Sequence, residues 1–354
     1  MRPTFSLRQA SGRWWVLLVA LAAGFVAVYL RVPPRAPARL EGTTMGTTWS
    51  VLLGGSPPRD RLAALRSDVE ALLDELDAIA STWKPDSELS RFNRLRGTEP
   101  VPISAPLAEL IALSLDVSRR SHGSFDITVG PLVEAWGFGR SGRPDVLPDG
   151  TELVRLRGRI GWEKLVLDGH TLSKRDPELE LDLSAVAKGY AVDRVSELLL
   201  ARGEANHLVE IGGELRAQGV SARGMPFRVG IEEPKPGPHA LRLAVSLRDR
   251  ALASSGNYRN HFAVDGRDYA HTLDPKNGRP VQHRLLAVSV LHERCSAADA
   301  WATALLAAGP EQAWELAIAE GIDALLLVEA PDGGVLQRLT PGFARALPTA
   351  PTEG

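Results

Sequence analysis

The chain has 354 residues, enough for one large domain or two ordinary ones with a substantial core. Its 41 Lys and Arg residues nearly balance its 43 Asp and Glu residues, so the overall charge gives no support to general nucleic-acid binding. Its single cysteine, Cys295, excludes an intramolecular disulfide and any zinc or iron–sulfur site built from cysteines.

The N-terminus carries an apolar segment behind positive charge. Residues 1–13 contain three arginines, and residues 14–30 are apolar and about long enough to cross a bilayer as a helix. Positive charge before such a segment predicts a cytoplasmic N-terminus and export of the rest of the chain. We expect 14–30 to be a transmembrane anchor. A cleaved signal sequence is the alternative, since Ala36-Pro37-Ala38 resembles a cleavage site; residues 31–39 then form a Pro- and Arg-rich tether.

The region from about 40 to 346 predicts one α+β domain, without an internal repeat or linker. Apolar residues at helical spacing indicate amphipathic helices in its first part, and alternating or apolar runs indicate strands in its middle. In chain order we expect a strand near 43–51, helices at 59–79, after Asp86 and at 106–121, strands at 164–167, 171–174 and 179–183, and a helix at 184–202.

The second part of the domain is richer in strands. Gly212-Gly213 bends two strands within 207–219, where a β-bulge is the plain structural reading. Further strands are expected at 227–231, 241–247, 285–291 and 324–328, helices at 297–308 and 312–320, and a disordered tail at 347–354.

One candidate site lies where the strand ending in Asp182 leads into the next helix. A turn of small residues leaves N–H groups free near the helix N-terminus, and Lys188 can neutralise an anion there, so the pattern predicts a phosphate site. The chain contains neither a P-loop motif nor a G-x-G-x-x-G motif, so this is a different kind of nucleotide site.

A second candidate site lies in residues 269–303. Asp274-Pro275 and Asn277-Gly278 predict a turn that holds His271 near a rigid corner. On the following helix, Asp299 and Thr303 are four residues apart and share a face, so they offer two oxygen ligands to a hard cation such as Mg²⁺. A helix cap or a surface pair would account for the same two residues, and a structural role would account for His271.

These signals occur in an order that resembles the ApbE family of FAD:protein FMN transferases over about 40 to 346. The motifs are Met45-Gly46-Thr47, Ser81-x-Trp83 with Ser87 to Asn93, Phe125-Asp126-x-Thr128, Asp182 to Asp193, Ile211-Gly212-Gly213-Glu214, Ser255-Gly256-x-Tyr258-Arg259, His271-x-x-Asp274-Pro275 and Ala298-Asp299-x-x-x-Thr303.

The resemblance implies a single T-fold-like domain of mixed or antiparallel sheets with flanking helices, on the periplasmic side of a bacterial inner membrane. It also implies a Mg²⁺-dependent enzyme that cleaves the pyrophosphate of FAD and releases AMP. The enzyme would join FMN by a phosphoester bond to a Thr or Ser hydroxyl of a partner protein, such as a redox-complex subunit of the Rnf or Nqr type.

The resemblance also assigns roles to residues. His271 matches the proposed base, and its ordinary pKa of about 6.5 suits the removal of a hydroxyl proton. The carbonyl of Ala185 and the side chains of Asp299 and Thr303 match metal ligands. Some members carry a further acid at the position of Ser296, and its absence leaves open whether this chain holds one Mg²⁺ or two. FAD-binding positions are matched by Met45, Trp83, Ser124, Phe125, Asp126, Asp182, Lys188, Thr272 and Leu273.

Two other functions fit the same residues. Hydrolysis of FAD to FMN and AMP would use the same metal and leaving group, with water in place of the acceptor hydroxyl. A flavin-binding module that performs no chemistry is the third reading, although simple binding would not need Asp299, Thr303 and His271 together.

Overall fold

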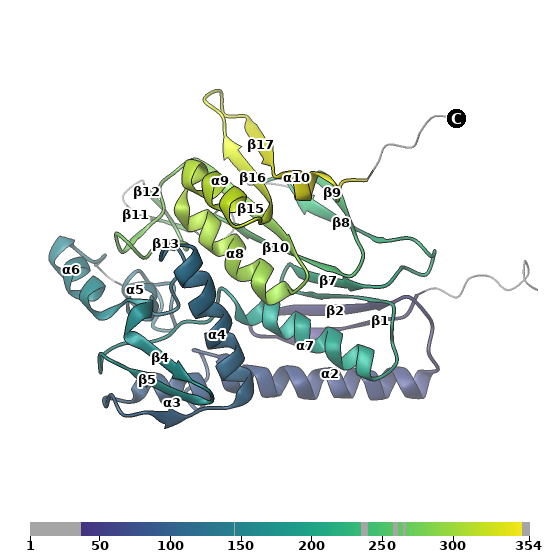
Figure 1. The fold of residues 1–354 in the computed structure, drawn as a ribbon, viewed down its shortest axis with the longest axis horizontal. Helices are drawn as coiled ribbons and strands as arrows, with labels where there is room; N and C mark the ends of the chain where they lie inside the picture. The colour runs from purple at the N-terminus through teal and green to yellow at the C-terminus, as the bar shows by residue number, and fades with distance from the viewer. Residues whose placement is uncertain (1–36, 145, 235–239, 258–260, 265–266, 349–354) are drawn as a thin grey trace, which may run out of the picture.

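A single large antiparallel sheet organises the molecule. The structure is a computed structural model that describes residues 37–348 except 145, 235–239, 258–260 and 265–266. The sheet has eight strands in the order β1-β2-β6-β7-β10-β15-β16-β17, and each neighbouring pair is antiparallel (Figure 1). The strands are β1 (Arg39–Thr44), β2 (Thr47–Leu53), β6 (His207–Ile211), β7 (Glu214–Gln218), β10 (Arg250–Gly256), β15 (Leu285–His292), β16 (Asp323–Glu329) and β17 (Val335–Leu339).

Helices cover one face of this sheet. Alternate side chains of each strand point to opposite faces, so Ala251 and Ala253 of β10 join the helices in the main core, while Leu252 joins a second core on the other face. The helices of the main core are α2 (Arg59–Ala80), α4 (Ala105–Arg120), α7 (Ala187–Ala201), α8 (Cys295–Ala308) and α9 (Pro310–Ala319). Figure 1 shows α8 lying along the sheet between α7 and α9.

The second face is covered by a hairpin and a short helix. The hairpin of β8 (Phe227–Glu232) and β9 (Leu241–Leu247) packs there with α10 (Pro341–Ala344), around the buried ring of Phe343. Smaller elements surround the ends of these layers. They are α3 (Glu88–Arg94), β3 (Val101–Pro102), α5 (Gly130–Ala135), α6 (Gly150–Arg159), η1 (Trp162–Lys164), β4 (Leu165–Asp168), β5 (Thr171–Lys174), β11 (His261–Val264), β12 (Arg267–Ala270), β13 (Leu273–Asp274) and β14 (Arg279–Pro280).

The sheet opens between β7 and β10, and this opening positions the site. The two strands pair only from Arg250 to Leu252, opposite Ala217 to Leu215. β10 then runs on to Gly256 while the chain of β7 turns back towards β6 through Gly212 and Gly213. Residues from both faces of the sheet therefore reach the gap.

The α+β class, the antiparallel sheet and the flanking helices are confirmed. The strand expected at 179–183 is wrong: this segment forms only an isolated bridge, Val129 with Glu180. The side chain of Asn93 in α3 instead bonds both the N–H and the carbonyl of Leu181 at 2.8 Å. The next helix begins at Ala187 rather than 184, because the Asp182 side chain accepts a hydrogen bond from the Ser184 N–H and holds residues 184–186 in a turn. The single strand expected near 43–51 is also wrong, since a turn at Met45 and Gly46 divides this region into β1 and β2. Among the elements of the main sheet we missed β10 and β17, and we also missed the short helices α5, α6 and α10.

The ends of the chain are described only in part. The apolar segment 14–30 and most of the tether lie outside the described residues. Within the described ranges, no helix has the length and apolar character needed to cross a membrane. At the other end, Leu347 donates a backbone hydrogen bond to Ala344 and packs against the second core, so the folded part extends past the expected boundary at 346. Residues 349–354 again lie outside the described part.

Candidate functional site

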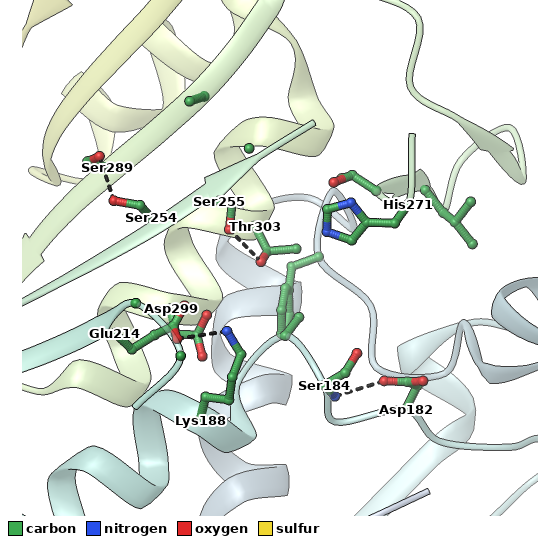
Figure 2. Close-up of a pocket in the computed structure, with 18 of the residues that line it drawn as sticks. Asp182, Ser184, Lys188, Glu214, Ser254, Ser255, His271, Ser289, Asp299 and Thr303 are labelled. Carbon is green, nitrogen blue, oxygen red and sulfur yellow. Dashed lines mark hydrogen bonds and ion pairs between the residues drawn. The ribbon is translucent and has the colours of Figure 1, made fainter. Parts of the chain in front are cut away.

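A cavity of about 490 Å³ occupies the opening between β7 and β10. Segments that are far apart in the sequence line it, including the starts of α7 and β7, the end of β10, the chain around β13 and one face of α8 (Figure 2). It brings together most of the predicted site residues, namely Ser124, Phe125, Asp126, Asp182, Ala185, Lys188, His271, Thr272, Leu273, Asp299 and Thr303.

Close packing of α7 on α8 places Lys188 and Asp299 at the same end of this cavity. The N–H of Gly189 donates to Asp299 Oδ2 at 3.0 Å. A Cβ atom on Gly189 would lie 2.5 Å from the carbonyl oxygen of Cys295, so only glycine allows this approach. Gly189 thus allows the close approach of the two helices that brings the neighbouring Lys188 to the same end as Asp299.

A buried carboxylate fixes the start of α8. Asp193 accepts hydrogen bonds from the N–H groups of Cys295 and Ser296 at 2.8 and 2.9 Å and from the Ser296 hydroxyl at 2.7 Å. Arg216 pairs with the same carboxylate at 2.6 Å. Ser296 is fully buried against Asp193 and does not line the cavity, so the position at which some family members carry an acid serves here to anchor the helix.

The charged end of the cavity contains one acid that the sequence analysis did not select. Glu214 is 2% exposed, lines the cavity and pairs with Lys188 at 2.7 Å. Burial raises its pKa to about 8, and the charge of Asp299 adds to this, while Lys188 opposes it. The signal was present in the sequence, since Glu214 ends the motif Ile211-Gly212-Gly213-Glu214.

Asp299 lies in a similar environment. Burial raises its pKa to about 6, opposed by the charge of Lys188 and by the hydrogen bond from Gly189. For Lys188 itself, burial would lower the pKa, but the charges of Glu214 and Asp299 outweigh this and raise it. Two buried carboxylates thus face one ammonium group. When both acids are ionised, this end carries an excess of negative charge, which an additional cation would balance.

The oxygen atoms at this end suit a hard cation such as Mg²⁺. Asp299 and Thr303 lie on one face of α8, and the Thr303 hydroxyl contacts that of Ser255 at 3.1 Å (Figure 2). Ala185 lies in the turn that also lines the cavity. In the described part of the chain, no cluster of three or more His, Cys, Asp or Glu side chains could hold a metal. An ion held by the predicted ligands would depend on the Asp299 carboxylate and on neutral oxygens, which Mg²⁺ accepts together with water and phosphate.

The opposite wall is a network of side chains that bind the backbone. Asp126 accepts hydrogen bonds from the N–H and hydroxyl of Thr128 at 2.8 and 2.7 Å and from the N–H of Trp162 at 3.0 Å. Burial nevertheless raises the pKa of Asp126 to about 6 against these bonds. Next to it, Ser124 accepts a hydrogen bond from the ammonium of Lys276 at 3.2 Å. Asp126 therefore holds this wall in shape.

His271 stands at the corner that the sequence predicted. It lies between β12 and β13, and Figure 2 shows its ring directed towards the side of the cavity where Ser255 and Thr303 lie. The ring of Phe138 meets it edge-on, with 6.4 Å between ring centroids. The following turn is fixed because the Trp136 indole donates to the Gly278 carbonyl at 2.8 Å.

Two predicted residues do not line the cavity. Met45 lies in the turn between β1 and β2 with a φ of 47°, and its side chain packs against the main core. Trp83 lies in the loop between α2 and α3 and is 64% exposed. Their roles in FAD binding stay predictions. The cavity also contains residues that we did not select, among them Ser254, Ser255 and Ser289.

Comparison with known proteins gives a consistent result. The model of the ApbE family matches residues 45–326. An FAD:protein FMN transferase of Vibrio cholerae is 40% identical over 316 residues, which are 89% of this chain and 94% of that protein. The structure of the flavin transferase ApbE from Vibrio cholerae superposes with a TM-score of 0.80 at 38% identity, covering 88% of this chain and 99% of the other. The apo form of the Pseudomonas stutzeri flavinyl transferase ApbE gives 0.80 at 37% identity, with 89% and 98% covered.

Proposed function

This chain belongs to the ApbE family and is a transferase, and we infer that it carries flavin from FAD to a protein. We propose in addition that FMN is the group transferred and that a Thr or Ser hydroxyl of the acceptor receives it. The P–O–P bond of FAD breaks, and a bond forms between the hydroxyl oxygen and the phosphorus of FMN. AMP leaves with the electron pair of the broken bond.

This proposal rests on one observation: three kinds of chemical group line the same cavity. An ammonium group and buried acids meet at one end, hydroxyl oxygens of Ser255 and Thr303 lie beside them, and His271 faces the same space. A site that only stored flavin would have no need for two buried acids that repel each other in the same cavity as an imidazole.

Each group has a distinct task in this proposal. Lys188 binds a diphosphate oxygen, and its positive charge stabilises the negative charge that develops on that oxygen during transfer. Asp299, Thr303 and the Ala185 carbonyl would hold Mg²⁺, which when bound neutralises the phosphate oxygens. His271 accepts the proton of the acceptor hydroxyl, whose own pKa lies far above neutrality. The Asp126 network keeps the opposite wall rigid, which orients the substrate.

Location and partner are further proposals. We propose that residues 14–30 anchor the enzyme in a bacterial inner membrane with the domain in the periplasm; the arginines before this apolar segment support that orientation. We propose a membrane redox-complex subunit, of the Rnf or Nqr type, as the acceptor.

A direct test uses the protein with FAD, Mg²⁺ and a candidate acceptor. Mass spectrometry of the acceptor should show one added FMN, and AMP should appear in equal amount. Omission of Mg²⁺, with EDTA present, should stop both. FMN and AMP release without any acceptor adduct would identify a hydrolase, and tight FAD binding without AMP would identify a storage module.

A further inference from the structure

The turn that joins β6 to β7 contacts the stem and the head of Lys188. Gly212 and Gly213 have φ angles of 61° and 103°, a region that favours glycine. A Cβ atom on Gly212 would lie 3.2 Å from Cδ of Lys188 and 2.9 Å from the methyl group of Thr47. The missing side chain therefore leaves the space through which the aliphatic stem of Lys188 passes.

Glu214, the first residue of β7 after this turn, holds the ammonium end of the Lys188 side chain. Glu214 Oε2 accepts from the Lys188 ammonium at 2.7 Å, and the Glu214 side chain is almost entirely buried while that of Lys188 is 31% exposed. A charge-assisted bond to a buried partner restricts a flexible lysine to one orientation. Figure 2 shows the Lys188 ammonium beside the carboxylates of Glu214 and Asp299.

The turn is itself held in place. The N–H of Gly213 donates to Glu210 Oε1 at 2.9 Å, and that of Gly212 donates to the Thr48 carbonyl at 3.1 Å. Both bonds hold the turn against strands of the main sheet, so the backbone from which the Glu214 side chain extends is fixed in position. A plain β-bulge or hairpin turn would need the glycines but not a buried acid aimed at a lysine of another element.

We propose that Gly212, Gly213 and Glu214 form a cradle for Lys188, and that Glu214 is the positioning residue that aims the ammonium at the diphosphate of FAD. This proposal rests on the proposed function, because it assumes that Lys188 meets the diphosphate. Glu214 acts only through Lys188 and makes no contact with the reacting atoms itself.

A double-mutant cycle tests the proposal. We expect Lys188→Met to lower kcat/KM for FAD by about 100-fold and Glu214→Gln to lower it by about 10-fold. Because Glu214 acts through Lys188, the double variant should be no slower than Lys188→Met alone. The dissociation constant of FAD, measured by flavin fluorescence in EDTA, should follow the same pattern without turnover.

The control is Asp323→Asn, which breaks an ion pair of similar length, 2.6 Å to Arg250, away from the cavity. This variant should lower the melting temperature and leave both kcat/KM and the dissociation constant of FAD unchanged. Glu214→Asp keeps the charge on a shorter side chain and should restore part of the loss seen in Glu214→Gln; it also replaces that variant in the cycle if Glu214→Gln does not fold.

Two outcomes would overturn the cradle. Multiplication of the two single losses in the double variant would show that Glu214 acts independently of Lys188, and unchanged FAD binding in Glu214→Gln would show that it acts on nothing in the cavity. If the wild-type protein fails to modify any acceptor, the proposed transfer reaction is wrong. The double-mutant cycle on FAD binding in EDTA still tests the cradle in that case.

Discussion

The two sides of the cavity are built in different ways. On the charged side, Lys188, Glu214 and Asp299 come from three elements of the central layers, and their positions depend on helix–helix and helix–sheet packing. On the other side, His271 and Asp126 lie in loops whose shape is set by local hydrogen bonds. We expect the charged side to dominate the rate through electrostatics, and the loop side to be easier to perturb without unfolding.

The largest effect is expected at Asp299. Asp299→Asn should lower transfer by about 10³-fold or more, since it removes the only carboxylate among the proposed metal ligands. Burial already raises the pKa of this group, so its neutral replacement should leave the melting temperature unchanged or higher. The assay is acceptor modification across a series of Mg²⁺ concentrations. Full activity in this variant would remove Asp299 from the metal site.

His271 tests the loop side. His271→Ala should lower transfer by about 10²-fold, the lower end of what a positioned base contributes. Added imidazole should restore part of the rate, and FAD binding should stay close to wild type. His170→Ala is a matched control because His170 is exposed and lies outside the cavity lining. Equal rates for wild type and His271→Ala across neutral pH would exclude a role as base.

On the loop side, local turn signals in the sequence predicted the position of His271 but not the hydrogen bonds that Asp126 makes. The turn after His271 follows from Asp274, Pro275, Asn277 and Gly278, which are local signals, and the structure contains it. Asp126, which we predict to bind FAD, lines the cavity, and its oxygens also accept bonds from its own chain. Residue type and spacing could not predict these bonds to Thr128 and Trp162, and the role of Asp126 in FAD binding stays a prediction.

On the charged side, helical spacing was enough to place Asp299 and Thr303 on one face of a helix. The pairing of Glu214 with Lys188 could not be predicted in this way, because it joins residues of two elements that meet only through the tertiary fold. The same holds for the anchoring of α8 by Asp193, whose partners lie about a hundred residues away. Such contacts depend on the packing of layers, which no local pattern encodes.

Asp126 provides a pH test of the loop wall. Its pKa in the folded protein, about 6, lies above the ordinary value of 3.8, so the folded state holds the proton more tightly than the unfolded chain. The resulting stabilisation is complete below about pH 4 and is lost as the pH rises through 6. Between pH 4.5 and 7, wild type should lose about 2 kcal/mol more stability than Asp126→Asn.

Urea unfolding of both proteins at the two pH values measures this difference. Asp126→Asn retains an oxygen that can accept the bonds from Thr128, which makes it the mildest neutral replacement. If the free energy of unfolding depends on pH in the same way in both proteins, Asp126 does not carry the effect. The pKa of Asp126 in the folded protein would then not be raised.

The smallest expected effect concerns the hydroxyl pair that joins the sheet to α8. Ser255→Ala removes the contact of 3.1 Å with the Thr303 hydroxyl, a bond worth about 1 kcal/mol, so the Mg²⁺ concentration for half-maximal transfer should rise about fivefold. Ser254→Ala on the same strand breaks the bond of 2.7 Å to Ser289 without touching Thr303, and should shift this concentration less. Because side chains alternate along β10, Ser255 faces α8 and Ser254 faces away. Equal shifts in the two variants would mean that the hydroxyl lining as a whole, rather than the orientation of Thr303, controls the metal requirement.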